Sequence, residues 1–260
     1  MDQIISVASI LRKKYYFKGY MHLKIIPGVS DSAIEEAMNL ATAVSLNIET
    51  PGRNYFNELS RKKKYDDDII RPIKYMSNLV RSKKRFSKIK LTTQFIVGAA
   101  KERDADILKY SSALYDKLNF NRVYFSGYQS NLDTTCDEHC QNFSLSNDMD
   151  NNFNREHRLY QADFLMRQYG FKEKELYYNN FGNLSLDKDP KEIWAEFNPS
   201  FYPVNINTAC KEELLRVPGM GPLSVKKILK LRKMHIISNL NDIGFKGKRY
   251  RKISNYIKFS

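Results

Sequence analysis

The chain has 260 residues, of which 42% are hydrophobic and 28% are charged, and its formal net charge is +14 at pH 7. This composition excludes a wholly disordered chain, and the length suits one large domain or two smaller ones. The excess of positive charge favours a polyanionic partner, nucleic acid first, although a generally lysine-rich proteome would produce the same excess.

The cysteines and the apolar segments indicate a cytoplasmic protein. Three cysteines are too few for a disulfide scaffold. No apolar run approaches the roughly 18 residues that span a bilayer. The short apolar stretch over residues 4–11 follows Asp2 and precedes Arg12, Lys13 and Lys14, which is the reverse of the charge order of a signal peptide. We therefore expect a protein that is neither secreted nor embedded in a membrane.

The first half of the chain is predicted to alternate helices with strands. Apolar residues at helical spacing indicate helices, and strict alternation of apolar and polar residues indicates strands. The expected order is a helix over 1–18, a strand over 20–26, a helix from 31 or 32, a strand over 44–49, a basic and mostly helical region over 53–90, a strand over 92–98, a helix over 103–118 and a strand over 122–128. Such alternation is typical of βαβ units, so we expect an α/β fold with a parallel sheet.

The predicted strands are apolar on one face only. The other face carries polar side chains, namely His22, Lys24, Ser45, Asn47, Glu49 and Gln94. Parallel strands that are buried on both faces are usually apolar throughout, and these polar groups could not form a dry core without extensive pairing. We therefore predict a wet, ligand-holding interior on one side of a curved sheet.

The second half of the chain is divided differently. Residues 129–154 are polar and predict a loop or insertion, a helix is expected over 155–169, and prolines interrupt the segment that follows. Residues 204–260 form a separate basic segment with its own apolar pattern. The expected domains are therefore 1–128, a loop-rich connection over 129–203, and an all-α module over 204–260. We expect no internal repeat of fixed period.

Residues 214–229 resemble the helix-hairpin-helix DNA-binding motif. Their sequence is Leu-Leu-Arg-Val-Pro-Gly-Met-Gly-Pro-Leu-Ser-Val-Lys-Lys-Ile-Leu. Glycines would let the hairpin turn and bring backbone amides close to a phosphate, and the start of the second helix adds a positive dipole end. The residues expected to bind DNA are Val217, Gly219, Met220, Gly221, Ser224, Lys226 and Lys227. The alternative is a helical hairpin used only for packing.

Two other features are interpreted structurally. Cys136, His139 and Cys140 could supply three metal ligands, but no second pair follows at ligand spacing, so we expect a solvated loop and no metal site. Asp163 and Arg167 stand four residues apart on the helix expected over 155–169, which is the spacing of an ordinary surface ion pair.

Several separate blocks together resemble the radical SAM proteins of DNA modification and repair. The blocks lie in order over residues 19–28, 45–49, 94–99, 122–126, 155–163, 169–171, 189–191 and 215–221. The resemblance spans nearly the whole chain. It implies a partial radical SAM-type (βα) barrel followed by a helix-hairpin-helix module. It also implies S-adenosylmethionine bound beside a [4Fe–4S] cluster, which a Cys-x3-Cys-x2-Cys loop after the first strand would hold.

The sequence departs from that family at the cluster. By this resemblance, the sequence would start at about the helix before the family's third strand, so we expect the first two βα units and the cysteine loop to be absent from it. Cys136 and Cys140 have the first spacing of the motif, but Phe143 stands where the third cysteine would be. Iron–sulfur clusters of this kind need thiolate ligands, so we expect no cluster on this chain alone.

The resemblance also assigns roles to the polar face of the sheet. Ser45, Asn47 and Glu49 would face the ribose and methionyl end of S-adenosylmethionine, and Gln94 the neighbouring wall. The side chains of His22 and Lys24 would line the substrate side. These assignments come from position in the fold alone.

The expected function is DNA binding by the C-terminal portion of a radical SAM enzyme that modifies or repairs DNA, a portion not catalytically competent alone. Hairpins of this type grip backbone phosphates without reading base sequence. One alternative is a subunit of a split enzyme, completed by a chain that supplies the missing barrel strands. The other is a non-functional gene remnant.

Overall fold

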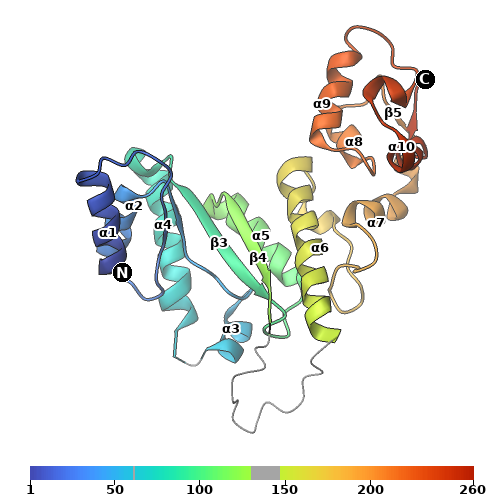
Figure 1. The fold of residues 1–260 in the computed structure, drawn as a ribbon. Coiled ribbons are helices and arrows are strands. Elements are labelled where there is room, and N and C mark those ends of the chain that lie inside the picture. Colours follow the sequence, from blue (N-terminus) through green and yellow to red (C-terminus); the bar gives the residue numbers. More distant parts are fainter. Residues whose placement is uncertain (61, 130–146) are drawn as a thin grey trace. The chain divides into compact units, whose positions relative to one another are not determined.

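A computed structural model describes residues 1–60, 62–129 and 147–260, with no side-chain description for residues 147–150 (Figure 1). The chain forms two compact units, residues 1–157 (unit 1) and residues 158–260 (unit 2). The segment over 158–203, which we expected to be a connection, thus belongs to the same unit as residues 204–260. No described helix has the length and apolar character that a bilayer span requires.

Unit 1 is built on a four-stranded parallel sheet. Its strands are β1 (His22–Lys24), β2 (Ala43–Ser45), β3 (Lys90–Val97) and β4 (Arg122–Gly127), and they are hydrogen-bonded in that order. Right-handed crossovers between consecutive parallel strands place the connecting helices on one face of a sheet. The α/β class is confirmed. The described strands form an open sheet with edges at β1 and β4, and they do not close into a barrel.

The helices of unit 1 are α1 (Asp2–Lys13), α2 (Asp31–Leu40), α3 (Arg53–Leu59), α4 (Arg71–Ser82) and α5 (Asp104–Leu118), with a π-helical turn over Tyr65–Ile70 and a 3-10 turn over Lys84–Phe86. All of these helices except α3 form one row. Contacts join α1 to α2, α2 to α4 and α4 to α5. The core comprises buried apolar side chains from these helices and from alternate positions of the strands, among them Ile34, Met38, Ile73, Met76, Ile107, Leu23, Val44, Leu46, Phe95 and Phe125.

Two helix boundaries differ from the prediction. The first helix ends at Lys13 rather than at residue 18, because the Arg12 guanidinium turns back and donates to the carbonyls of Phe17 and Gly19. The helix expected to begin at residue 155 is α6 (Asn147–Tyr169), so the predicted loop is wrong over 147–154. Asn and Asp residues favour turns, and their abundance here disguised the start of α6.

Two buried ion pairs involve α6, one to Asp104 in unit 1 and one within the helix itself. In unit 1, Arg155 lies 2.9 Å from Asp104, whose carboxylate is fully buried. In unit 2, the pair that we expected at the surface is also buried: Arg167 lies 2.7 Å from Asp163, whose side chain has no exposed area. Both pairs therefore contribute to the fold, since removing one partner would leave a buried charge uncompensated.

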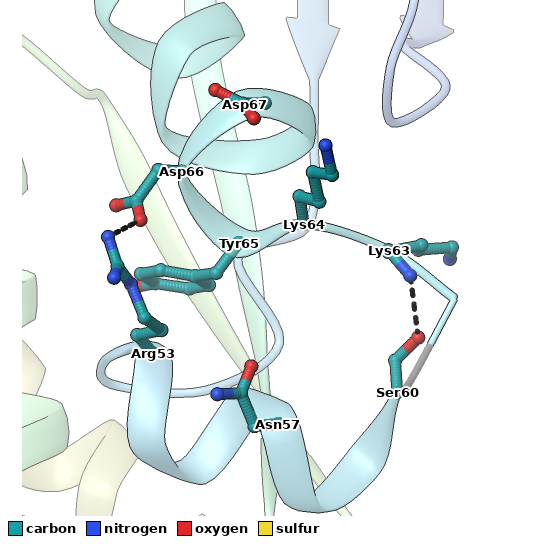
Figure 2. A pocket seen from close by; sticks show the side chains of 8 residues that line it. All are labelled: Arg53, Asn57, Ser60, Lys63, Lys64, Tyr65, Asp66 and Asp67. Atoms are coloured by element: carbon teal, nitrogen blue, oxygen red, sulfur yellow. Dashed lines mark hydrogen bonds and ion pairs between the residues drawn. The ribbon is translucent and has the colours of Figure 1, made fainter.

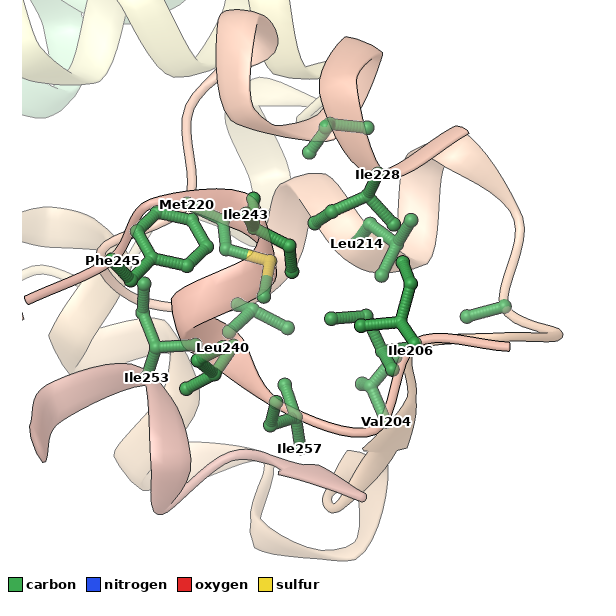
Figure 3. Packing of buried hydrophobic residues seen from close by; sticks show 14 of the residues in the cluster. Val204, Ile206, Leu214, Met220, Ile228, Leu240, Ile243, Phe245, Ile253 and Ile257 are labelled. Atoms are coloured by element: carbon green, nitrogen blue, oxygen red, sulfur yellow. The ribbon is translucent and has the colours of Figure 1, made fainter. Parts of the chain in front are cut away.

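Unit 2 is helical apart from one short pair of parallel strands. After α6 come a 3-10 turn over Glu173–Glu175, α7 (Pro190–Phe197), a 3-10 turn over Pro199–Phe201, β5 (Val204–Asn205), α8 (Lys211–Arg216), α9 (Pro222–Leu231), η5 (Leu240–Ile243), α10 (Gly247–Ser254) and β6 (Ile257–Lys258). β5 pairs with β6 in parallel, with Val204 opposite Ile257. The elements from β5 to β6 enclose one apolar cluster, whose buried residues run from Val204 to Ile257 (Figure 3).

A bulge interrupts the sheet where β2 continues beyond its last regular pair. Ser45 pairs with Thr92, but Glu49 pairs with Phe95, so the β2 side has one extra residue. The Thr93 hydroxyl fills the irregularity, because it accepts a hydrogen bond from the Ile48 amide (3.0 Å) and donates one to the Leu46 carbonyl (2.8 Å). Bulges re-aim neighbouring side chains, and this one sets the backbone of Glu49.

Two adjacent buried threonines provide a test of the bulge. Thr93→Val removes both hydrogen bonds and leaves a buried amide and carbonyl unpaired, so we expect a loss of about 1–3 kcal/mol in the free energy of unfolding. The Thr92 hydroxyl is also buried but has no hydrogen-bond partner in the described structure, so Thr92→Val should be neutral or stabilising. Urea unfolding of both variants measures the difference, and equal losses would contradict this role for Thr93.

Candidate functional site

The face of the sheet opposite the helices brings together the polar residues predicted from the sequence. Lys24 pairs with Ser45, Ser45 with Thr92, and Thr92 with Arg122, so these four residues form one row across the sheet. Alternation along the strands puts His22 and Gln94 on the same face. His22 and Lys24 are exposed, Ser45 is buried, and Gln94 is half-buried.

Glu49 is the most unusual of the polar residues that were predicted from the sequence. Its φ is 64°, a left-handed conformation that residues other than glycine seldom adopt, and its Oε2 is buried with no hydrogen-bond partner in the described structure. Burial raises the pKa of the Glu49 carboxyl, while Lys24, Asn47 and Lys63 lower it. Strained backbone and unsatisfied buried oxygens gather at ligand sites. The carboxylate could therefore accept hydrogen bonds from a ligand that carries an ammonium or hydroxyl group.

Burial also affects the imidazole at the sheet edge. Partial burial of His22, followed by repulsion from Lys24, holds the pKa of the imidazole below its usual value. The ring is therefore more readily neutral than an ordinary histidine, and a neutral imidazole can accept a hydrogen bond as well as donate one.

A hollow of about 640 Å³ lies between α3 and the π-helical turn (Figure 2). Its lining is polar and consists of Arg53, Asn57, Ser60, Lys63, Lys64, Tyr65, Asp66 and Asp67. Arg53 forms an ion pair with Asp66, and Lys63 is one of the cations that act on Glu49. The sequence described this region only as basic, because a hollow formed by a loop and two short helices leaves no periodic signal.

The described residues do not fit an iron–sulfur cluster. They contain no group of three or more His, Cys, Asp or Glu residues placed to hold a metal ion. Cys136, His139 and Cys140 lie outside the described residues. Cys210 is exposed and precedes α8, where its Sγ accepts a hydrogen bond from the Glu213 amide (3.4 Å).

The predicted hairpin, residues 217–221 (hairpin 1), joins α8 to α9. Gly219 has φ +85°, and the Met220 amide donates to the Val217 carbonyl (3.0 Å), so the chain reverses there. Gly221 has an ordinary φ of −117°, so the turn requires one glycine rather than the two expected. The side chains of Val217 and Met220 are buried, so only their backbone could meet a ligand.

Cationic side chains donate hydrogen bonds to the carbonyls of the turn residue Gly219 and of Met220, which follows it. The Gly219 carbonyl accepts a hydrogen bond from Arg249 Nε (2.9 Å), and the Met220 carbonyl accepts one from Lys191 Nζ (2.6 Å). At the start of α9, the amides of Leu223 and Ser224 have no acceptor among the described residues, as is usual in the first turn of a helix. The carbonyls are thus satisfied inside the protein, while these two amides are available to an anion.

The two predicted lysines of α9 have different surroundings. Lys226 is exposed, and no partner for its amine is found in the described part of the chain. Lys227 Nζ instead donates to the Ile243 carbonyl at 2.7 Å. Lys226 is therefore free to pair with a phosphate, whereas Lys227 already links α9 to the residue that precedes Gly244.

A second hairpin repeats the first 25 positions later, contrary to our expectation that no repeat is present. Residues 243–247 (hairpin 2) join η5 to α10, and Gly244 has φ +91°. The matching positions are Leu215 and Leu240, Gly219 and Gly244, Met220 and Phe245, Lys226 and Arg251, Lys227 and Lys252, and Ile228 and Ile253. The signal was present in the sequence, but hairpin 2 lacks the Pro-Gly-x-Gly pattern and its leading helix is one short turn.

The two hairpins are connected crosswise. Lys227, on the helix after hairpin 1, donates to the carbonyl of Ile243 in hairpin 2. Arg249, on the helix after hairpin 2, donates to the carbonyl of Gly219 in hairpin 1. A Cβ at Gly219 would lie 3.0 Å from Cγ1 of Ile253, so α10 packs closely against the first turn. The two hairpins therefore form a single structural element with a shared core.

No family model matches the chain, and no similar curated protein or solved structure is found. The candidate sites therefore rest on their own geometry and on the motifs in the sequence.

Alanine substitutions at four glycines of unit 2 separate the cost of close packing from the cost of backbone strain. Gly170 and Gly247 have positive φ and open space around a Cβ, so alanine there should cost about 1–2 kcal/mol through strain alone. Gly219→Ala adds the contact with Ile253, and we expect about 1 kcal/mol more. Gly244→Ala meets only Lys227 Nζ at 3.5 Å and should behave like the first two. Urea unfolding provides the four values, and equal values would show that α10 does not constrain hairpin 1.

The raised pKa of the Glu49 carboxyl leads to a prediction about stability. Because the pKa of Glu49 is raised in the folded state, ionisation of this residue opposes folding, and its stabilising contribution is lost as pH rises through that pKa. We expect Glu49→Gln to raise the Tm at pH 7 and to have a smaller effect near pH 4. Glu36→Gln, at an exposed position of α2, is the control and should leave the Tm unchanged. A lower Tm for Glu49→Gln at pH 7 would show that the carboxylate is fully compensated.

Proposed function

We propose that unit 2 binds duplex DNA through its backbone phosphates, without recognising base sequence. The observation that carries the proposal is the pair of hairpins, each followed by a helix whose first amides have no acceptor among the described residues and which carries exposed cations. Helix starts of this kind bind phosphate because the amides and the helix dipole act together. Lys226 beside hairpin 1 and Lys248 beside hairpin 2 are exposed and add charge at the two positions.

Two linked hairpins suit a polymer of phosphates better than a single anion. Each can hold one phosphate, and the crosswise hydrogen bonds from Lys227 and Arg249 keep the two sites in a constant relation. Contacts to phosphate position a protein on DNA but carry no sequence information. The net charge of +14 supports the same partner through long-range attraction.

For unit 1 we propose binding of a small ligand with ammonium and hydroxyl groups on the polar face of the sheet. The support is the arrangement of Lys24, Ser45, Glu49 and Gln94, together with the resemblance to radical SAM proteins, which names S-adenosylmethionine. Such a ligand would supply the methionyl sulfonium chemistry of that family. This chain's own residues would bind and orient it: the Glu49 carboxylate would accept hydrogen bonds, and the Lys24 ammonium would attract a carboxylate.

The edge of the sheet supports the split-enzyme alternative. Among the described strands, β1 pairs only with β2, so the backbone groups of His22 and Lys24 that point away from β2 have no strand partner. Open edges pair readily with another chain. We therefore keep, as a second candidate, a subunit whose partner adds parallel strands to β1 and supplies the cluster-binding cysteines.

DNA binding is tested by fluorescence anisotropy with a labelled duplex at several salt concentrations. The logarithm of the affinity should fall linearly with the logarithm of salt, with a slope of about −0.9 for each phosphate neutralised. Lys226→Ala and Lys248→Ala should each weaken binding to all sequences alike and reduce the slope by about one contact.

The control carries the same change of charge away from the hairpins. Lys88→Ala, at an exposed position of unit 1, should leave both the affinity and the slope almost unchanged. Equal weakening by all three variants would indicate diffuse attraction to the whole basic chain. If affinity for the duplex falls with Lys226→Ala but not with Lys248→Ala, the DNA interface is limited to hairpin 1.

A further inference from the structure

The first turn of α7 contains a lysine in an unfavourable place. Lys191 is only 6% exposed, and it is the second residue of its helix, where the positive end of the helix dipole opposes a cation. Its ammonium lies under hairpin 1, because Nζ donates to the Met220 carbonyl at 2.6 Å. A buried charge at such a position is expensive unless it is well compensated.

The groups around Lys191 compensate the charge of its ammonium only in part. Nζ lies 4.5 Å from the centre of the Tyr169 ring, and Asp189 is the carboxylate that favours its charge. The Asp189 side chain also caps α7 by accepting a hydrogen bond from the Lys191 amide (2.8 Å). Two cations of α10, Lys252 and Arg249, oppose the charge, and Lys252 forms an ion pair with Glu192.

We propose that Lys191 is a positioning residue for hairpin 1 and that its ammonium couples phosphate binding there to proton uptake. The ammonium fixes the carbonyl of Met220, the residue before Gly221 and the start of α9, and it adds a positive charge beneath the turn. A phosphate on the α9 amides would provide the negative charge that this site lacks, and it would therefore favour the protonated form. The inference rests on the proposed DNA binding of unit 2.

The direction of the pH dependence follows from burial. Desolvation lowers the pKa of Lys191 to about 7, against an ordinary value near 10.5. In the free protein the amine is therefore charged below about pH 7 and neutral above it, so affinity should be highest at low pH and decrease as pH rises through this range. The same shift means that protonation opposes folding, so the residue destabilises the fold below pH 7 and this penalty disappears as pH rises toward 10.5.

The test is a duplex titration from about pH 6 to pH 9 at constant ionic strength. We expect the wild-type chain to lose affinity by several-fold, up to about tenfold, over this range. Lys191→Met should bind weakly with little change over the range, and Lys191→Arg should bind at every pH because its charge persists. Lys226→Ala should bind more weakly than wild type but keep the same pH dependence.

A second measurement separates this inference from the proposed function. Without DNA, the Tm of wild type relative to Lys191→Met should rise from pH 6 to pH 9, because only wild type loses a buried charge. DNA binding that is independent of pH, or equally pH-dependent in Lys191→Met, would overturn the inference while leaving DNA binding intact. Absence of DNA binding in every variant and at every pH would overturn the proposed function, and this inference with it.

Discussion

The left-handed turn at Gly219 is the constraint on which the proposed interface depends. The turn brings α9 back across α8 and leaves its first amides without an acceptor in the described structure, while Ile253 packs against the glycine. A side chain at this position would have to adopt an unfavourable φ and displace α10. Because α10 is the helix that follows hairpin 2, the geometry of one hairpin depends on that of the other. The side chains of Arg249, which is exposed, and Lys191, which is buried, then satisfy the two carbonyls, so the turn presents donors rather than acceptors to the outside.

Unit 1 follows a different physical principle. The helices α1, α2, α4 and α5 lie in one row along a parallel sheet, so one face of the sheet is packed and the other keeps polar groups. The bulge held by Thr93 places Glu49 in a strained conformation with an unsatisfied oxygen. A fold gains no stability from such a residue, which supports the ligand binding proposed for this unit. The functions proposed for the two units thus rest on different chemistry, a polar sheet face in unit 1 and free helix amides with cations in unit 2.

The sequence was sufficient for features with a local or periodic cause. Alternation in the strands predicted the parallel sheet and its polar face, and the glycines near residue 219 predicted hairpin 1. It failed where the cause lies in tertiary contacts. The start of α6 depends on buried partners of Arg155, Lys191 is recognisable only from what surrounds it, and the bulge depends on a threonine from a neighbouring strand. Hairpin 2 was missed although its 25-residue spacing was visible, because its turn residues differ from those of hairpin 1.

The most direct test of the account is an amide chemical-shift titration of the isotope-labelled chain with a short DNA duplex, followed by NMR. The account predicts that the largest shifts fall on two separate stretches, the amides of Leu223 and Ser224 after hairpin 1 and those of Lys248 and Arg249 after hairpin 2. Both sets should move with the same affinity, because the hairpins form one element. Shifts spread over exposed lysines of both units, with no maximum at either hairpin, would contradict it.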